Sequence, residues 1–103
     1  MEGHSLISTD ILASYAADAA LEIDGVRRLV EGTRPRHHGV RVTNEDGVVA
    51  VELHLGLDWG ASAPAVGAAV QERVADYLGR MTDLATASVD VVIDEIGPPP
   101  EGT

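Results

Sequence analysis

The residues of this chain best suited to chemistry are a serine, four histidines and several carboxylates. Ser62 lies in Gly60-Ala61-Ser62-Ala63-Pro64, between a strand-like and a helix-like segment, as the serine of a nucleophile elbow does. Pro64 occupies the place of the second glycine that such a tight turn uses, and a serine before a helix is an ordinary N-cap. His54 lies in a strand-like segment, and no pattern fixes a base or an orienting carboxylate beside it. The sequence therefore predicts a capping role for Ser62 and no catalytic residue.

The histidines and carboxylates also lack a recognised metal-binding pattern. His37 and His38 are adjacent, so their side chains diverge in an extended segment, unlike the two ligands of a His-Glu-x-x-His helix. Carboxylates with strand or helix spacing form two pairs, Asp90 with Asp94 and Glu72 with Asp76. Such pairs could bind a cation or serve acid–base catalysis, but they are also the ordinary solvated faces of an acidic protein. We expect no metal and no cofactor.

A basic cluster is unusual in a chain otherwise dominated by carboxylates. It comprises Arg34, Arg36, His37, His38 and Arg41. The cluster could bind an acidic segment of a partner protein, or it could be a loop whose charges stay hydrated. It has no Gly-x-x-Gly clamp and too few neighbouring aromatic residues for a platform that stacks RNA bases. These five residues are the candidate partner-binding site.

Composition limits the classes of partner. The 103 residues include 17 acidic and 7 basic side chains, which give a formal charge of −10. A surface of that sign repels phosphate backbones and anionic lipids, so we expect neither nucleic-acid nor direct lipid binding. The absence of cysteine excludes disulfides and thiolate sites. No segment has the ~18 consecutive apolar residues of a membrane span, which favours a cytoplasmic protein.

Periodicity predicts one α+β domain. Thr9 or Asp10 could cap a first helix that ends near Gly25, and Asp46-Gly47 lies in a predicted hairpin turn. The expected elements, in order, are a helix from about residue 10, a strand over 26–30, hairpin strands over 40–43 and 49–59, a helix over 62–81 and a strand over 89–94. Each helix has one apolar stripe and the sheet has one apolar face, which favours a two-layer sandwich. We expect two helices on one face of a small mixed sheet, in the order α-β-β-β-α-β.

Three further expectations concern the ends of the chain and one glycine. Residues 1–7 are expected to be a flexible tail, residues 8–96 the domain, and residues 97–103 a disordered proline-rich tail. Gly67, inside the second helix, costs about 0.5–1 kcal/mol relative to alanine, which suggests a close approach of the backbone to a neighbouring element.

An ordered pattern along residues 6–96 resembles the alkaline shock protein family of Gram-positive bacteria. The pattern includes Gly25-Val26, Val40-Arg41-Val42, Leu57-Asp58-Trp59-Gly60, Val70-Gln71, Val74, Met81-Thr82-Asp83-Leu84 and Val89-Asp90-Val91. Trp59 stands where the family usually has tyrosine, and Asp83 where it more often has glycine. The resemblance implies a cytoplasmic, non-enzymatic envelope-stress protein that self-associates and is held near the membrane by an integral membrane partner. It implies no catalytic residue.

Two other classes of function remain open from the sequence. The domain could be a regulatory module that binds a small molecule between the second helix and the sheet, or a small enzyme or metal-binding protein that uses its acidic face. Thermal unfolding with divalent cations separates the last class from the others, because a bound cation raises the melting temperature by mass action.

Overall fold

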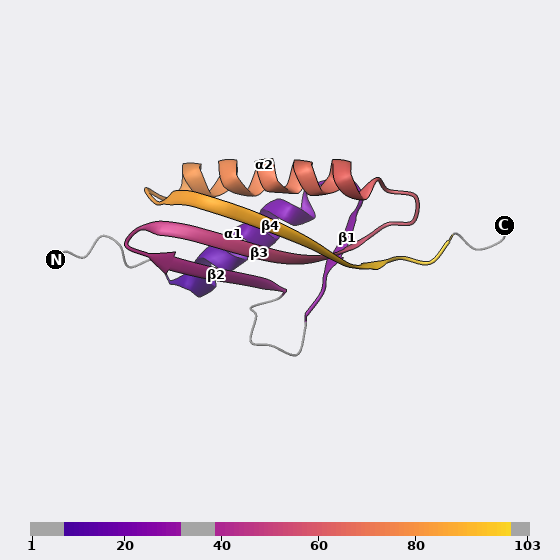
Figure 1. The fold of residues 1–103 in the computed structure, drawn as a ribbon, viewed down its shortest axis with the longest axis horizontal. Coiled ribbons are helices and arrows are strands. Elements are labelled where there is room, and N and C mark those ends of the chain that lie inside the picture. The colour runs from indigo at the N-terminus through magenta and orange to yellow at the C-terminus, as the bar shows by residue number, and fades with distance from the viewer. Residues whose placement is uncertain (1–7, 32–38, 100–103) are drawn as a thin grey trace.

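The computed structural model describes residues 8–31 and 39–99. Its elements are α1 (Thr9–Leu21), β1 (Val26–Leu29), β2 (Val40–Glu45), β3 (Val48–Leu57), α2 (Ala63–Met81) and β4 (Ala85–Ile96). The predicted order of helices and strands is confirmed (Figure 1).

β3 is the central strand of a mixed sheet. It pairs antiparallel with β2 through Val48–Leu53 and antiparallel with β1 through Leu55–Leu57. β4 runs parallel to β3 along its whole length, so β1 and β2 share the opposite side of β3. The α2 helix connects the parallel strands β3 and β4, which cannot be joined by a tight turn.

Both helices cover one face of the sheet, with α1 against β1 and β2 and α2 against β4. Alternation along β3 buries its odd-numbered residues, and the core is built from leucine, valine and alanine. The helices meet through Tyr15 and Tyr77, whose rings contact edge to face with centroids 6.0 Å apart. The predicted α+β sandwich, with two helices on one face of a small mixed sheet, is confirmed.

Local chemistry explains where these elements begin. The Ser62 hydroxyl accepts a hydrogen bond from the Ala65 N–H at 3.3 Å, so its predicted role as the N-cap of α2 is confirmed. Ser8 caps α1 through the Ile11 N–H at 3.1 Å, and the predicted caps Thr9 and Asp10 lie within the helix. The hairpin turn has positive φ at Asp46 (56°) and Gly47 (84°), as two-residue hairpin loops of this type require.

The structure corrects three details. β3 ends at Leu57, where its pairing with β1 ends, and Trp59 is 58% exposed in the following turn instead of continuing the strand. β4 is longer than expected at both ends. The prediction for Gly67 is wrong, because a Cβ atom placed there meets nothing within 4 Å.

The two tails expected at the ends of the chain lie wholly or partly outside the described residues. Residues 97–99 have no regular secondary structure, and residues 1–7 and 100–103 are not described. Neither of the two helices in the described part of the chain is long and apolar enough to cross a membrane.

A candidate interaction surface on the open face of the sheet

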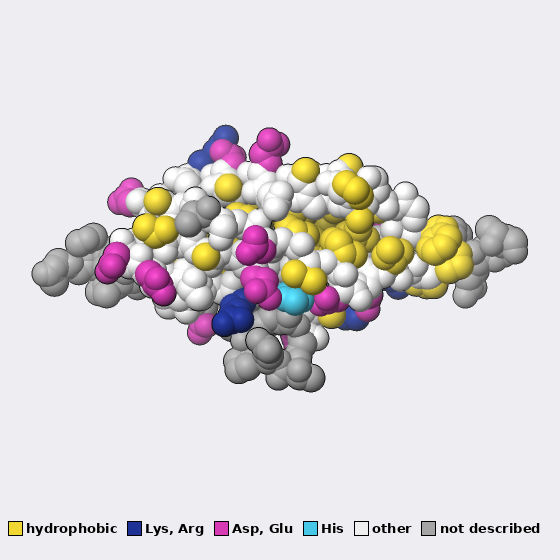
Figure 2. Space-filling model, in the orientation of Figure 1, with side chains coloured by type: hydrophobic (Ala, Val, Ile, Leu, Met, Phe, Trp, Pro, Cys, Tyr) yellow, Lys and Arg dark blue, Asp and Glu magenta, His cyan; other side chains and the backbone are white. Residues whose placement is uncertain are grey.

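The sheet face opposite the helices carries polar side chains from three strands that could recognise a partner. We call it the open face and define it by Arg41, Thr43, Ala50, Glu52, His54, Asp90 and Asp94. Strand register places Arg41 of β2 beside Glu52 of β3, and Glu52 beside Asp90 of β4. Figure 2 views this face and shows acidic side chains gathered along its middle. The surface therefore has a predominantly acidic centre.

His54 is held between two carboxylates on this face. Its Nε2 lies 2.5 Å from Oε2 of Glu52, its Nδ1 lies 2.6 Å from Oδ2 of Asp94, and its side chain is only 13% exposed. Each ring nitrogen therefore contacts one carboxylate, and the contact with Asp94 links β3 to β4. No sequence pattern indicated a carboxylate beside His54, and the structure places two there.

One of these two carboxylates could have been found in the sequence. Glu52 precedes His54 by two residues, and residues two apart on a strand share a face. Asp94 comes from β4, where the register shifts between the pairs Leu55–Ile93 and Gly56–Glu95. At this irregularity Asp94 has no register partner on β3, and its carboxylate contacts His54. Neither the parallel pairing nor the bulge can be read from local periodicity.

A second cross-strand contact joins Arg28 of β1 to Glu95 of β4 across β3. Arg28 Nε donates to Glu95 Oε1 at 2.6 Å and Arg28 Nη2 donates to Glu95 Oε2 at 2.9 Å. Gly56 lies between them, and a Cβ there would be 2.7 Å from the Glu95 carboxylate. The hydrogen bond with Arg28 lowers the pKa of Glu95, and the same contact raises the pKa of Arg28. Both side chains are exposed, so solvent screens this pair.

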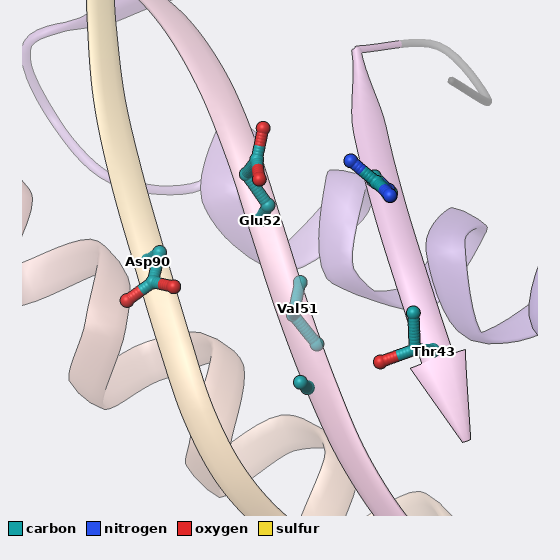
Figure 3. A pocket seen from close by; sticks show the side chains of 6 residues that line it. Thr43, Val51, Glu52 and Asp90 are labelled. Atoms are coloured by element: carbon teal, nitrogen blue, oxygen red, sulfur yellow. The ribbon is translucent and has the colours of Figure 1, made fainter. Parts of the chain in front are cut away.

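A shallow hollow of about 270 Å³ lies on the open face between β2, β3 and β4. Its lining residues are Arg41, Thr43, Ala50, Val51, Glu52 and Asp90 (Figure 3). Figure 3 shows the carboxylates of Glu52 and Asp90 on neighbouring strands, with Thr43 on the far side of β3. The hollow could receive a cationic group between these carboxylates.

The candidate basic cluster is only partly placed. Arg41 lies on β2 beside Glu52, whereas Arg34, Arg36, His37 and His38 fall outside the described residues. In the other acidic pair, Glu72 with Asp76, the Asp76 carboxylate forms an ion pair with Arg80 at 3.2 Å one turn along α2. Within residues 8–31 and 39–99, no group of three or more His, Asp or Glu side chains has a metal-binding arrangement.

A second hollow, of about 420 Å³, lies between the end of α1 and the beginning of α2. It is lined by Glu22, Ile23, Asp24, Ala65, Val66 and Ala69. In the described part of the chain no polar or charged side chain is fully buried, so neither hollow holds a buried polar group that would orient a small ligand.

The chain is similar to proteins linked to the cell envelope. Residues 1–98 match the model of the alkaline shock protein 23 family, which is described as having a cell envelope-related function. The uncharacterized protein YqhY of Bacillus subtilis (strain 168) is 29% identical over 97 residues, which cover 84% of this chain and 72% of YqhY.

Solved structures of the MamM CTD have a similar fold. A zinc form has a TM-score of 0.67 at 16% identity, covering 91% of this chain and 92% of that chain. A manganese form has a TM-score of 0.66 at 19% identity, covering 85% of this chain and 99% of that chain. At these identities the similarity concerns the fold alone.

Proposed function

Because the chain belongs to the alkaline shock protein 23 family, whose function is related to the cell envelope, we propose that it is a non-enzymatic protein of the envelope stress response. It acts by binding other proteins: a membrane-embedded partner that holds it near the membrane, and further copies of itself. The family match over residues 1–98 carries this proposal.

The state of the reactive side chains supports a non-enzymatic role. Both ring nitrogens of His54 are within hydrogen-bonding distance of carboxylates, so the ring has no nitrogen left to serve a nucleophile. The hydroxyl of Ser62 accepts a hydrogen bond from the backbone at the start of α2. Charged side chains instead lie on an open sheet face, where another protein can reach them.

The charge supports attachment through a protein instead of through lipid. At a net charge of −10, the chain is repelled by anionic lipid head groups. Arg34, Arg36 and Arg41 would each contribute about 1 kcal/mol at an anionic surface, but this attraction is screened within about 8 Å at physiological salt. A partner that presents a complementary segment avoids this repulsion.

Cross-linking in the source cells, with and without alkaline stress, tests the proposal. Capture of a tagged chain should recover an integral membrane protein and untagged copies of the chain, with more of both under stress. A non-cross-linked sample provides the control for binding after lysis. Recovery of neither species under either condition would refute the proposal.

Self-association can be measured independently with purified protein. The negative charges of two copies repel each other, and salt screens this repulsion: the Debye length falls to about 8 Å at ~0.15 M salt. Association should therefore strengthen as salt is raised. Sedimentation velocity across a salt and concentration series measures this directly. A monomer under every condition would remove self-association from the proposal.

A further inference from the structure

The outer edge of β4 offers a binding surface for an extended segment. Among the described strands, β4 pairs only with β3, and an edge strand presents N–H and C=O groups that can pair with another chain. Gln71, an exposed residue of α2, donates from Nε2 to the Val89 carbonyl at 2.9 Å. Gln71 therefore already fills one backbone acceptor of the β4 edge, and an added strand would take its place there.

The two sides of β4 differ in chemistry. On the open face, Asp90 neighbours Glu52, and Asp94 contacts His54. On the helix side, Val89, Val91 and Ile93 are only partly buried against the core. Figure 2 shows hydrophobic side chains exposed along the line between α2 and β4. A strand added at this edge would therefore have carboxylates beside one of its faces and aliphatic side chains beside the other.

The register limits the length of such a strand. Shifts in the pairing of β3 with β4 occur between Val49 and Ala50 and again between Leu55 and Gly56. The longest uninterrupted stretch of regular pairing on β4 therefore covers residues 88–93. Pro98 and Pro99 follow the strand, and proline cannot donate to a sheet. An incoming segment would pair with about six residues, which is an ordinary strand length.

A second copy of the chain fits this edge poorly. Antiparallel pairing of two β4 strands centred on Val92 would place Asp90 of each copy opposite Asp94 of the other, and like charges opposite each other destabilise a sheet. Pairing of β4 with the β2 edge of a second copy would place Arg41 and Glu45, one charge of each sign, beside β4. Neither pairing gives the acidic edge a net electrostatic attraction.

We propose that the β4 edge binds, by strand addition, an extended segment in which arginine or lysine alternates with aliphatic residues. The proposal rests on the function proposed above, because it names the kind of segment that the membrane-embedded partner supplies. Cytoplasmic segments next to membrane helices carry an excess of lysine and arginine, so the required charge is available there. The basic residues lie beside Asp90 and its neighbours, and the aliphatic residues extend the core beside α2.

Binding of synthetic peptides to the full chain tests strand addition. The probe is a short peptide of alternating valine and arginine, capped at both ends and long enough to pair with residues 88–93. A block peptide of the same composition, with all valines before all arginines, has the same charge without the alternation. Two further peptides are N-methylated on either the valines or the arginines, which removes the N–H donors along one edge or the other.

Amide chemical shifts and hydrogen exchange locate the peptide, and a titration gives its affinity. The alternating peptide should protect amides of β4, and the block peptide and one N-methylated peptide should bind about tenfold more weakly, since each loses backbone pairing. Equal affinity of the block peptide, or perturbation centred away from β4, would overturn the proposal. Protection of β4 that rises with protein concentration in the absence of peptide would assign the edge to a second copy and would also overturn it.

A charge reversal supplies a matched pair of variants. Asp90→Lys should weaken binding of the alternating peptide about fivefold, because it replaces a favourable cross-strand pair with a repulsive one. Asp18→Lys makes the same charge change at an exposed site of α1 and should change the affinity less than twofold. An equal loss of affinity in both variants would mean that the peptide responds only to the net charge of the protein, which would contradict strand addition.

The peptide experiment and the cross-linking experiment test the strand-addition proposal and the proposed function separately. If the peptides fail but cross-linking still recovers a membrane protein, the chain binds its partner through another surface. If the peptides bind β4 but no membrane protein is recovered, the edge is a binding site and the proposed envelope partner is wrong.

Discussion

Asp46 and Gly47 connect β2 to β3 through two consecutive left-handed backbone conformations. The Gly47 N–H donates to Oδ1 of Asn44 at 3.1 Å. A Cβ atom placed on Gly47 would lie 3.9 Å from its nearest neighbour, Cδ2 of Leu84. Space is therefore available at Gly47, and the backbone angle alone makes glycine the favoured residue.

Replacing Gly47 tests this account of the turn. Gly47→Val should lower the free energy of unfolding by about 1–3 kcal/mol, because a β-branched residue is strained at positive φ. Gly47→Asn is the matched control and should lose less, since asparagine tolerates this conformation. Urea unfolding measures both, and a valine variant as stable as the parent would contradict the turn assignment.

The Arg28–Glu95 contact predicts a dependence of stability on pH. Arg28 lowers the pKa of Glu95 in the folded state, so the fold favours the ionised carboxylate. This stabilisation is present above the ordinary pKa of glutamate and is lost as pH falls through the lowered pKa of the folded state. The stability difference between the parent and Glu95→Gln should therefore be largest near neutral pH and shrink in acid.

Urea unfolding of both proteins across a pH series measures this difference. Because both side chains are exposed, added salt should reduce it as well. A difference that is independent of pH would mean that the charge of Glu95 contributes nothing to stability.

At the scale of elements, two glycines have opposite roles. Gly67 lies in α2 with nothing within 4 Å of its Cβ position, whereas Gly25 has φ of +98° and a Cβ there would be 2.8 Å from Cγ2 of Val66. Gly67→Ala should stabilise the protein by about 0.5–1 kcal/mol, because alanine restricts the unfolded chain and favours the helix. Gly25→Ala should instead destabilise it by about 1–3 kcal/mol.

Thermal or urea unfolding of both variants measures these changes. A Gly67→Ala protein that is less stable than the parent would show that α2 approaches another element at this position. A Gly25→Ala protein of unchanged stability would mean that the turn after α1 relaxes without cost.

Local periodicity predicts the elements well because each of them depends on a few neighbouring residues. Ser62 and Pro64 mark the start of α2, and Asp46-Gly47 marks the hairpin. The end of β3 could not be predicted, because it is set by where β1 ceases to pair, and alternation continues past it to Trp59. The neighbours of His54 and Glu95 likewise depend on the parallel register of β4 and its bulges, which only the folded sheet determines.

For the whole molecule, net charge and topology lead to the same conclusion. The chain carries a formal net charge of −10. Its open face brings carboxylates from β3 and β4 together, which suits a basic protein segment better than a phosphate-rich surface. These features support the proposal that a protein, and not lipid, holds the chain at the envelope.

Sedimentation with membranes tests this claim most directly. The purified chain is centrifuged with membranes from the source cells, with the same membranes after their exposed protein segments have been digested and the protease inhibited, and with protein-free vesicles of the extracted lipids. We predict that the chain pellets with the untreated membranes and stays in the supernatant with the other two. Equal pelleting with the protein-free vesicles would contradict the claim, because lipid alone would then suffice to hold the chain.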